Sequence, residues 1–130
     1  MPLLTGQWSM IVNGHEGTLS INFVQPNAEV SFNVIVNGLG LTPNAPTQSR
    51  HGFWDEAAQA ITLQLVETSG PNNGRAVTFE GWQFQVPVAA VPGQDVTWHL
   101  TGVFTSYGAQ GISNARRPRF GWHATQTQTL

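Results

Sequence analysis

Apolar and polar side chains alternate with a period of two through most of this chain. Between positions 30 and 36, for example, Val30, Phe32, Val34 and Val36 alternate with the polar residues Ser31 and Asn33. Successive side chains of a β-strand point to opposite faces, so this period predicts half-buried strands. No segment has the longer period of an amphipathic helix, and the expected fold class is therefore all-β.

Eight stretches have this character, and most of them are separated by clusters of Gly, Pro and Asn. The predicted strands cover residues 7–12, 18–23, 30–36, 50–54, 61–65, 75–86, 96–101 and 119–125. An even number of consecutive antiparallel strands can pair its last member with its first, which removes exposed sheet edges. We expect a single antiparallel eight-stranded up-and-down β-barrel over residues 1–130, with a β-sandwich as the alternative. Gly81 is expected to mark a bulge or bend.

Charged residues make up only 9% of the 130 residues, and the net charge is −2. A general nucleic-acid or anionic-membrane binder would need a broad basic surface, so neither partner is expected. Low charge favours self-association, and a homo-oligomer is expected. The chain has no cysteine and hence no disulfide. Residues 1–6 do not resemble a signal peptide, which predicts a soluble protein, cytoplasmic as given or secreted with its signal removed.

No arrangement of residues typical of an enzyme nucleophile, a phosphate-binding loop or a dinucleotide site occurs in the sequence. Asp55 and Glu56 are adjacent, so on a strand they would face opposite ways, and a turn suits both. Glu80 is expected to face outward. No catalytic residue and no cofactor are predicted, although a barrel can act as a cyclase or isomerase by shape alone.

Two of the four histidines fall on the polar faces of the last two predicted strands. If those strands are neighbours, the rings of His99 and His123 could approach each other. Zinc normally takes three or four protein ligands, which this pair does not supply. We therefore predict solvated or hydrogen-bonded histidines and no metal site.

Five tryptophans are several times the ordinary number for a chain of this length. Trp8, Trp98 and Trp122 share their strand faces with aliphatic residues and are expected to point inward. Trp54 and Trp82 flank glycines, and exposed or interfacial positions are equally consistent with them. The residues predicted to bind a ligand are Trp54, Trp82, Trp98, Trp122, Phe53 and Tyr107.

The stretch Gly6-Gln7-Trp8, with an arginine cluster just before the last strand, resembles the calycin superfamily of lipocalins and avidins. The resemblance implies that Trp8 lies across the floor of the barrel and that an arginine packs over its indole. The candidates for this barrel-closing role are Arg116, Arg117 and Arg119, and an anion site or a subunit contact is the alternative for them. The run from Ser9 to Gly14 does not match the biotin-binding residues of avidins.

These observations lead to a first hypothesis of a non-catalytic barrel with a tryptophan-lined pocket for a small apolar or aromatic molecule. A lectin-like carbohydrate-binding module is one alternative. A structural or assembly protein without a ligand is another.

Overall fold

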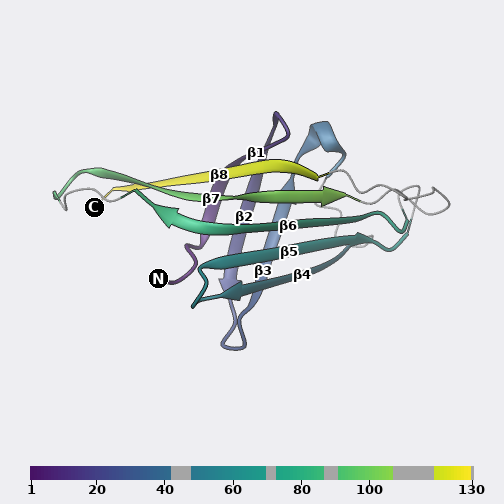
Figure 1. Cartoon of the computed structure of the whole chain (residues 1–130), viewed down its shortest axis with the longest axis horizontal. Coiled ribbons are helices and arrows are strands. Elements are labelled where there is room, and N and C mark those ends of the chain that lie inside the picture. The colour runs from purple at the N-terminus through teal and green to yellow at the C-terminus, as the bar shows by residue number, and fades with distance from the viewer. Residues whose placement is uncertain (42–47, 70–72, 87–90, 107–118, 130) are drawn as a thin grey trace.

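The computed structural model describes residues 1–41, 48–69, 73–86, 91–106 and 119–129. Eight strands form one closed antiparallel barrel, in which each strand pairs with the next and β8 pairs with β1. They are β1 (Gly6–Val12), β2 (His15–Val24), β3 (Glu29–Ile35), β4 (Gln48–Asp55), β5 (Ala60–Glu67), β6 (Ala76–Gln85), β7 (Asp95–Ser106) and β8 (Arg119–Thr129). The predicted up-and-down barrel is confirmed over the sandwich. In Figure 1, β4 to β8 run across the view and β1 to β3 cross behind them.

The turn between β1 and β2 has the two-residue form that the sequence predicts. Asn13 and Gly14 have φ angles of 47° and 82°, both in the left-handed region. Asn and Gly adopt this region more readily than other residues, and a turn of this kind matches the twist of the strands it joins. The sequence thus sets the register of the first hairpin, in which Val12 pairs with His15.

The core fills the barrel with the alternating apolar residues of all eight strands. Leu19, Ile21, Val34 and Leu63 are buried, as the periodicity predicts. Phe23 departs from it, because the pairing of β2 with β3 shifts between Ile21 and Phe23. One extra residue in a strand reverses the direction of the side chains beyond it, so that Phe23 is 52% exposed.

Gly81 does not mark a bulge, since β6 keeps its register with β5 and with β7 on both sides of this residue. Its role is to leave space inside the barrel. A Cβ atom at Gly81 would lie 2.8 Å from Cζ2 of Trp122 and 2.5 Å from the carbonyl oxygen of Thr101. The Trp122 indole therefore lies across the inner face of β6, where its Nε1 donates to the carbonyl oxygen of Glu80 at 3.1 Å.

Helical structure in the described residues is confined to one 3₁₀ turn, η1 (Asn37–Leu39). Asp55 and the residues after it form a hydrogen-bonded turn, in which the Asp55 carboxylate accepts the amide of Ala58 at 3.1 Å. Among the parts of the chain that the structure describes, no helix has the length and apolar character to span a bilayer.

Candidate functional site

The N-terminal segment, residues 1–5, lies against one end of the barrel and is held there by two glutamines. Gln83 points inward from β6 and is only 3% exposed. Its Oε1 accepts the amide of Leu4, and its Nε2 donates to the carbonyl oxygen of Pro2, both at 2.9 Å. Gln126 of β8 donates to the carbonyl oxygens of Thr5 and Gln7 at 3.2 and 2.8 Å. We call this segment the strap.

Trp8 lies directly inside the strap. Its side chain is fully buried in the core, and its Nε1 donates to the carbonyl oxygen of Leu4 at 3.1 Å. A buried indole needs a partner for its single N–H, and the strap supplies it. This end of the barrel therefore depends on the strap and Trp8 together.

Trp54 and Glu56, at the end of β4, complete the same end of the barrel. The Trp54 indole is buried, and its Nε1 donates to Oε2 of Glu56 at 2.6 Å. The amino group of Met1 lies 2.8 Å from Oε1 of the same carboxylate. The hydrogen bond from that amino group, followed by the one from Trp54, lowers the pKa of Glu56. Glu56 is thus ionised at neutral pH and faces two fixed donors.

A pocket of about 510 Å³ opens between the strap, the end of β2 and Trp54. We call it the end pocket. The bulge in β2 turns Phe23 toward it, next to Val24. Its walls include Leu3, Asn22, Phe23, Val24, Trp54 and Glu56.

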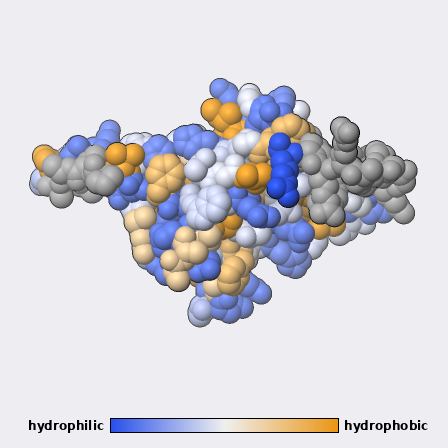
Figure 2. All heavy atoms as spheres, in the orientation of Figure 1, coloured by the Kyte–Doolittle hydropathy of each residue, from blue (hydrophilic) through white to orange (hydrophobic). Residues whose placement is uncertain are grey.

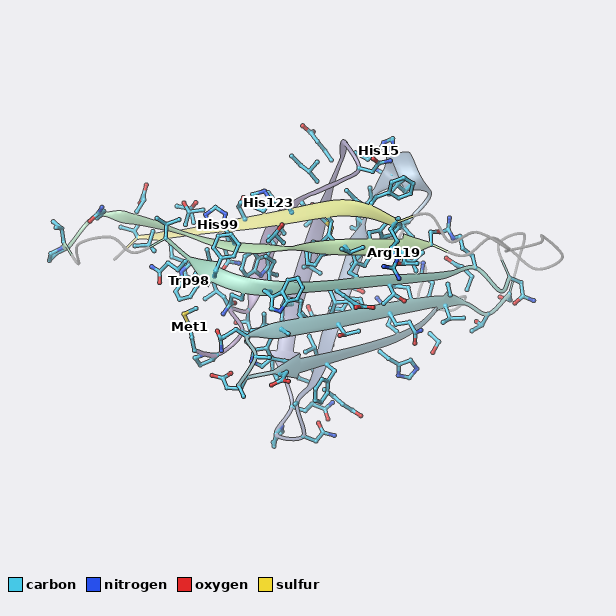
Figure 3. All side chains as sticks on the ribbon, viewed as in Figure 1. Met1, His15, Trp98, His99, Arg119 and His123 are labelled. Atoms are coloured by element: carbon cyan, nitrogen blue, oxygen red, sulfur yellow. The ribbon has the colours of Figure 1, made fainter. Side chains whose placement is uncertain are left out.

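A second feature lies on the outside of the barrel, over β6, β7 and β8. Trp82 is 55% exposed and Phe84, two residues further along β6, is 41% exposed. The Phe84 ring stacks on His99, with centroids 4.9 Å apart and planes 8° from parallel. Nδ1 of His99 lies 3.0 Å from Nε2 of His123, and the two labelled rings lie side by side in Figure 3.

The sequence prediction that these two histidine rings approach each other is confirmed. Their centroids are 5.3 Å apart and their planes differ by 3°. The distance between the two ring centroids equals the distance between the two nitrogens plus the radius of each ring. The rings therefore lie edge to edge, and one nitrogen donates a hydrogen bond to the other. Within the described ranges, no group of three or more His, Cys, Asp or Glu side chains is placed to hold a metal ion.

The residues predicted to bind a ligand do not gather in one pocket. Trp122 is buried and packs edge-on against Phe79, with ring centroids 5.6 Å apart. Trp98 is partly buried against the core. Phe53 and Trp82 are exposed on the outer surface, and Tyr107 lies outside the described residues. Among the members of the predicted set that the structure describes, Trp54 alone lines the end pocket.

Of the three arginines predicted to close the barrel, the structure describes one. Arg116 and Arg117 fall in residues 107–118, outside the described part of the chain. Arg119 begins β8, whereas Ser9, next to Trp8, pairs with Thr125 at the middle of that strand. The separation along β8 is about 20 Å, and Figure 3 shows Arg119 far from the strap residue Met1. Arg119 is therefore not the residue that covers the Trp8 indole.

Three residues that shape these sites were not singled out from the sequence. Gln83 shares the phase of the buried residues Val77 and Phe79, and a polar side chain in that phase signals a buried hydrogen-bonding role. Phe84 lies on the same outward-facing side of β6 as Trp82, and this spacing could have indicated an exposed aromatic patch. Phe23 gave no such signal, because a bulge cannot be read from alternation.

Comparison with known proteins gives no relative from which a function could be transferred. No family model, no curated protein and no solved structure matches this chain.

Proposed function

We propose that this protein is a non-catalytic binding barrel whose ligand, a small apolar or aromatic molecule, occupies the end pocket. The observation that carries the proposal is the pocket itself. Its volume of about 510 Å³ falls within the range of about 300–1,000 Å³ that is usual for small-molecule sites.

The chemistry of the walls indicates the kind of ligand. Leu3, Phe23 and Val24 offer apolar surface, which suits a flat or aliphatic body. Asn22 and Glu56 add polar groups at the margin, and the Glu56 carboxylate can accept a hydrogen bond from a ligand N–H or O–H. The expected ligand is a largely apolar molecule with one donor group.

Binding without catalysis is supported by the same residues. Glu56 is the only acid or base among the six wall residues named, and its hydrogen bonds to Trp54 and Met1 favour the charged form. A carboxylate with a lowered pKa is a weak base and a poor proton donor at neutral pH. The fixed carboxylate is therefore suited to recognition.

The resemblance to the calycin superfamily is part of the support for this proposal. An eight-stranded barrel with a buried tryptophan at one end is the architecture that the resemblance implies. It supports a binding function at a barrel end, although biotin is not the proposed ligand.

The test is a screen of small apolar and aromatic compounds by ligand-observed NMR and by thermal shift. Binding to the native state raises the melting temperature by mass action. The variant Val24→Trp fills the pocket and should abolish both signals. A screen in which no compound gives either signal with the wild type would overturn the proposal.

The matched control is Val91→Trp, which adds the same volume at an exposed valine outside the pocket. It should bind as the wild type does. If Val24→Trp and Val91→Trp bind the same compounds equally well, the ligand site lies elsewhere.

A further inference from the structure

The outer surface of β6, β7, β8 and β1 carries a contiguous group of exposed or partly exposed apolar and aromatic side chains. We call it the aromatic face, and it consists of Ile11, Trp82, Phe84, His99, Val103 and His123. The register places Trp82, Thr101, His123 and Ile11 in one row across the four strands. In Figure 2, orange and pale spheres of apolar and weakly polar residues lie among blue ones on this side of the molecule.

The middle of the aromatic face carries no acidic side chain, lysine or arginine. The row beside the one just described consists of Phe84, His99, Thr125 and Ser9. Charged side chains appear at its margins, with Glu80 next to Val103 on one side and Glu16 next to Ile11 on the other. Protein–protein interfaces have this composition, with aromatic residues in the centre and charges excluded to the rim.

Several polar groups of the aromatic face are hydrogen-bonded within the chain. His99 and His123 bond each other at 3.0 Å, and the Thr101 hydroxyl donates to the carbonyl oxygen of Trp122 at 3.2 Å. A sugar would need free donors and acceptors to match its hydroxyl groups. The aromatic face instead offers apolar surface, which favours an apolar protein partner over a glycan.

The stacked rings also hold the surface in a fixed shape. Phe84 packs on His99, and the hydrogen bond fixes the orientation of His99 relative to His123. Side chains that are ordered before association lose less conformational entropy when a partner arrives. The aromatic face is therefore preorganised for a rigid, complementary surface.

The outer surface of the four strands that carry the aromatic face is about as large as a stable dimer needs, and the six residues of the face cover part of it. β6, β7 and β8 contain 10, 12 and 11 residues. At about 3.3 Å per residue and about 4.8 Å between strands, they span about 500 Å² of sheet before β1 and the relief of the side chains are added. A specific interface buries about 800 Å² of accessible surface on each partner. Together the four strands provide an area of this order.

We propose that the occupant of the aromatic face is a second copy of this chain, packed face to face about a two-fold axis. Sheets stack in this way about 10 Å apart, with the side chains of the two faces interleaved. A two-fold axis brings the same patch of both copies together, so one uncharged patch is sufficient for both sides. The end pocket lies outside this interface, and the two proposals are independent.

The test is the mass of the protein in solution, measured by light scattering and by sedimentation from 1 to about 100 µM, a range that covers the affinities of ordinary homodimers. The wild type should be a dimer or a larger even assembly. Trp82→Asp places a charge at the β6 side of the interface, on its largest exposed aromatic residue, and should give a monomer with an unchanged circular dichroism spectrum. Trp82→Phe keeps an aromatic side chain there and should retain association.

The control is Phe23→Asp, which puts the same charge at an equally exposed aromatic residue outside the aromatic face. It should associate as the wild type does. A monomeric wild type at the highest concentration, or a Trp82→Asp variant that still associates, would overturn the proposal. Glycan-array binding that is lost in Trp82→Asp, from a monomeric wild type, would assign the face to carbohydrate instead.

Discussion

Trp122 shows how single residues set the shape of this barrel. Its large ring fits inside because Gly81 on β6 has no side chain, while Gly102, the partner of Gly81 on β7, lets the backbones of the two strands approach closely. A Cβ atom at Gly102 would lie 1.8 Å from the carbonyl oxygen of Glu80. The close packing at this place in the barrel therefore depends on the two glycines and the tryptophan together.

The first prediction is that Gly81→Ala destabilises the protein. The added methyl group must displace Trp122 or the backbone of β7, and such overpacking costs about 1–3 kcal/mol. Chemical denaturation should show the loss as a lower midpoint with an unchanged slope. Gly121→Ala is the control, because nothing lies within 4 Å of a Cβ atom there, and its stability should stay within about 0.5 kcal/mol of the wild type.

The second prediction concerns the pH dependence of Glu56. Its hydrogen bonds with the amino group of Met1 and with Trp54 lower its pKa in the folded state below the ordinary value of 4.5. A lowered folded-state pKa contributes stability above the unfolded-state pKa, and this contribution is lost as the pH falls through the folded-state value.

Glu56→Gln removes this contribution. The difference in stability between the wild type and Glu56→Gln should be constant near neutral pH and should shrink as the pH falls below about 4.5, the ordinary value. Thermal denaturation at a series of pH values measures it. A difference that stays the same down to pH 2 would contradict an ionic role for this carboxylate.

At the scale of the elements, alternation in the sequence predicted the strands well and their irregularities poorly. Val30, Phe32 and Val34 lie on one buried face of β3, as their spacing indicates. The bulge in β2 was missed because the extra residue is defined by the partner strand. Pairing between strands, not the sequence of one strand, directs Phe23 toward the end pocket.

The strap is the second element that alternation could not predict. Residues 1–5 show no strand pattern, and their position depends on hydrogen bonds to Gln83 and Gln126 from distant parts of the chain. A candidate pocket with a wall of this kind cannot be recognised before the fold is known. The sequence does contain one hint, the buried phase of Gln83.

The third prediction is that Gln83→Ala releases the strap. The amide of Leu4 and the carbonyl oxygen of Pro2 would lose their buried partner, at a cost of about 1–3 kcal/mol for each group left unsatisfied. Hydrogen exchange should show faster exchange at the amide of Leu4, with little change in β7. Gln64→Ala, at an exposed glutamine of β5, should leave that amide as it is in the wild type.

At the scale of the whole molecule, closure of the barrel was open to two interpretations from sequence. It depends on pairing between Ser9–Val12 and Trp122–Thr125, which lie at opposite ends of the chain. The sequences of the first and last strands do not show whether these strands pair with each other, as in a barrel, or form the edges of the sheets of a sandwich. The structure decides for the barrel, and the same pairing brings Ile11 beside His123 on the aromatic face.

The strands of the closed barrel are not equally joined. β7 and β8 pair without a break from Asp95–Thr129 to Thr105–Arg119. β3 and β4 share two register pairs, Glu29–Phe53 and Val30–Gly52. Free energies of local opening follow the number of contacts that must break, so the junction of β3 and β4 is the weakest seam of the barrel.

The fourth prediction follows from this inequality. The amide of Trp54 bonds the carbonyl oxygen of Ala28 across the seam at 2.9 Å, and it should exchange through a partial opening that exposes little surface and depends weakly on denaturant. The amide of Leu100, in the continuous ladder of β7, should exchange through global unfolding, with the full denaturant dependence. Native-state hydrogen exchange at increasing denaturant measures both. If the two amides showed the same free energy of opening and the same dependence on denaturant, the seam would be no weaker than the ladder between β7 and β8. The barrel would then open as one cooperative unit, and the prediction would be wrong.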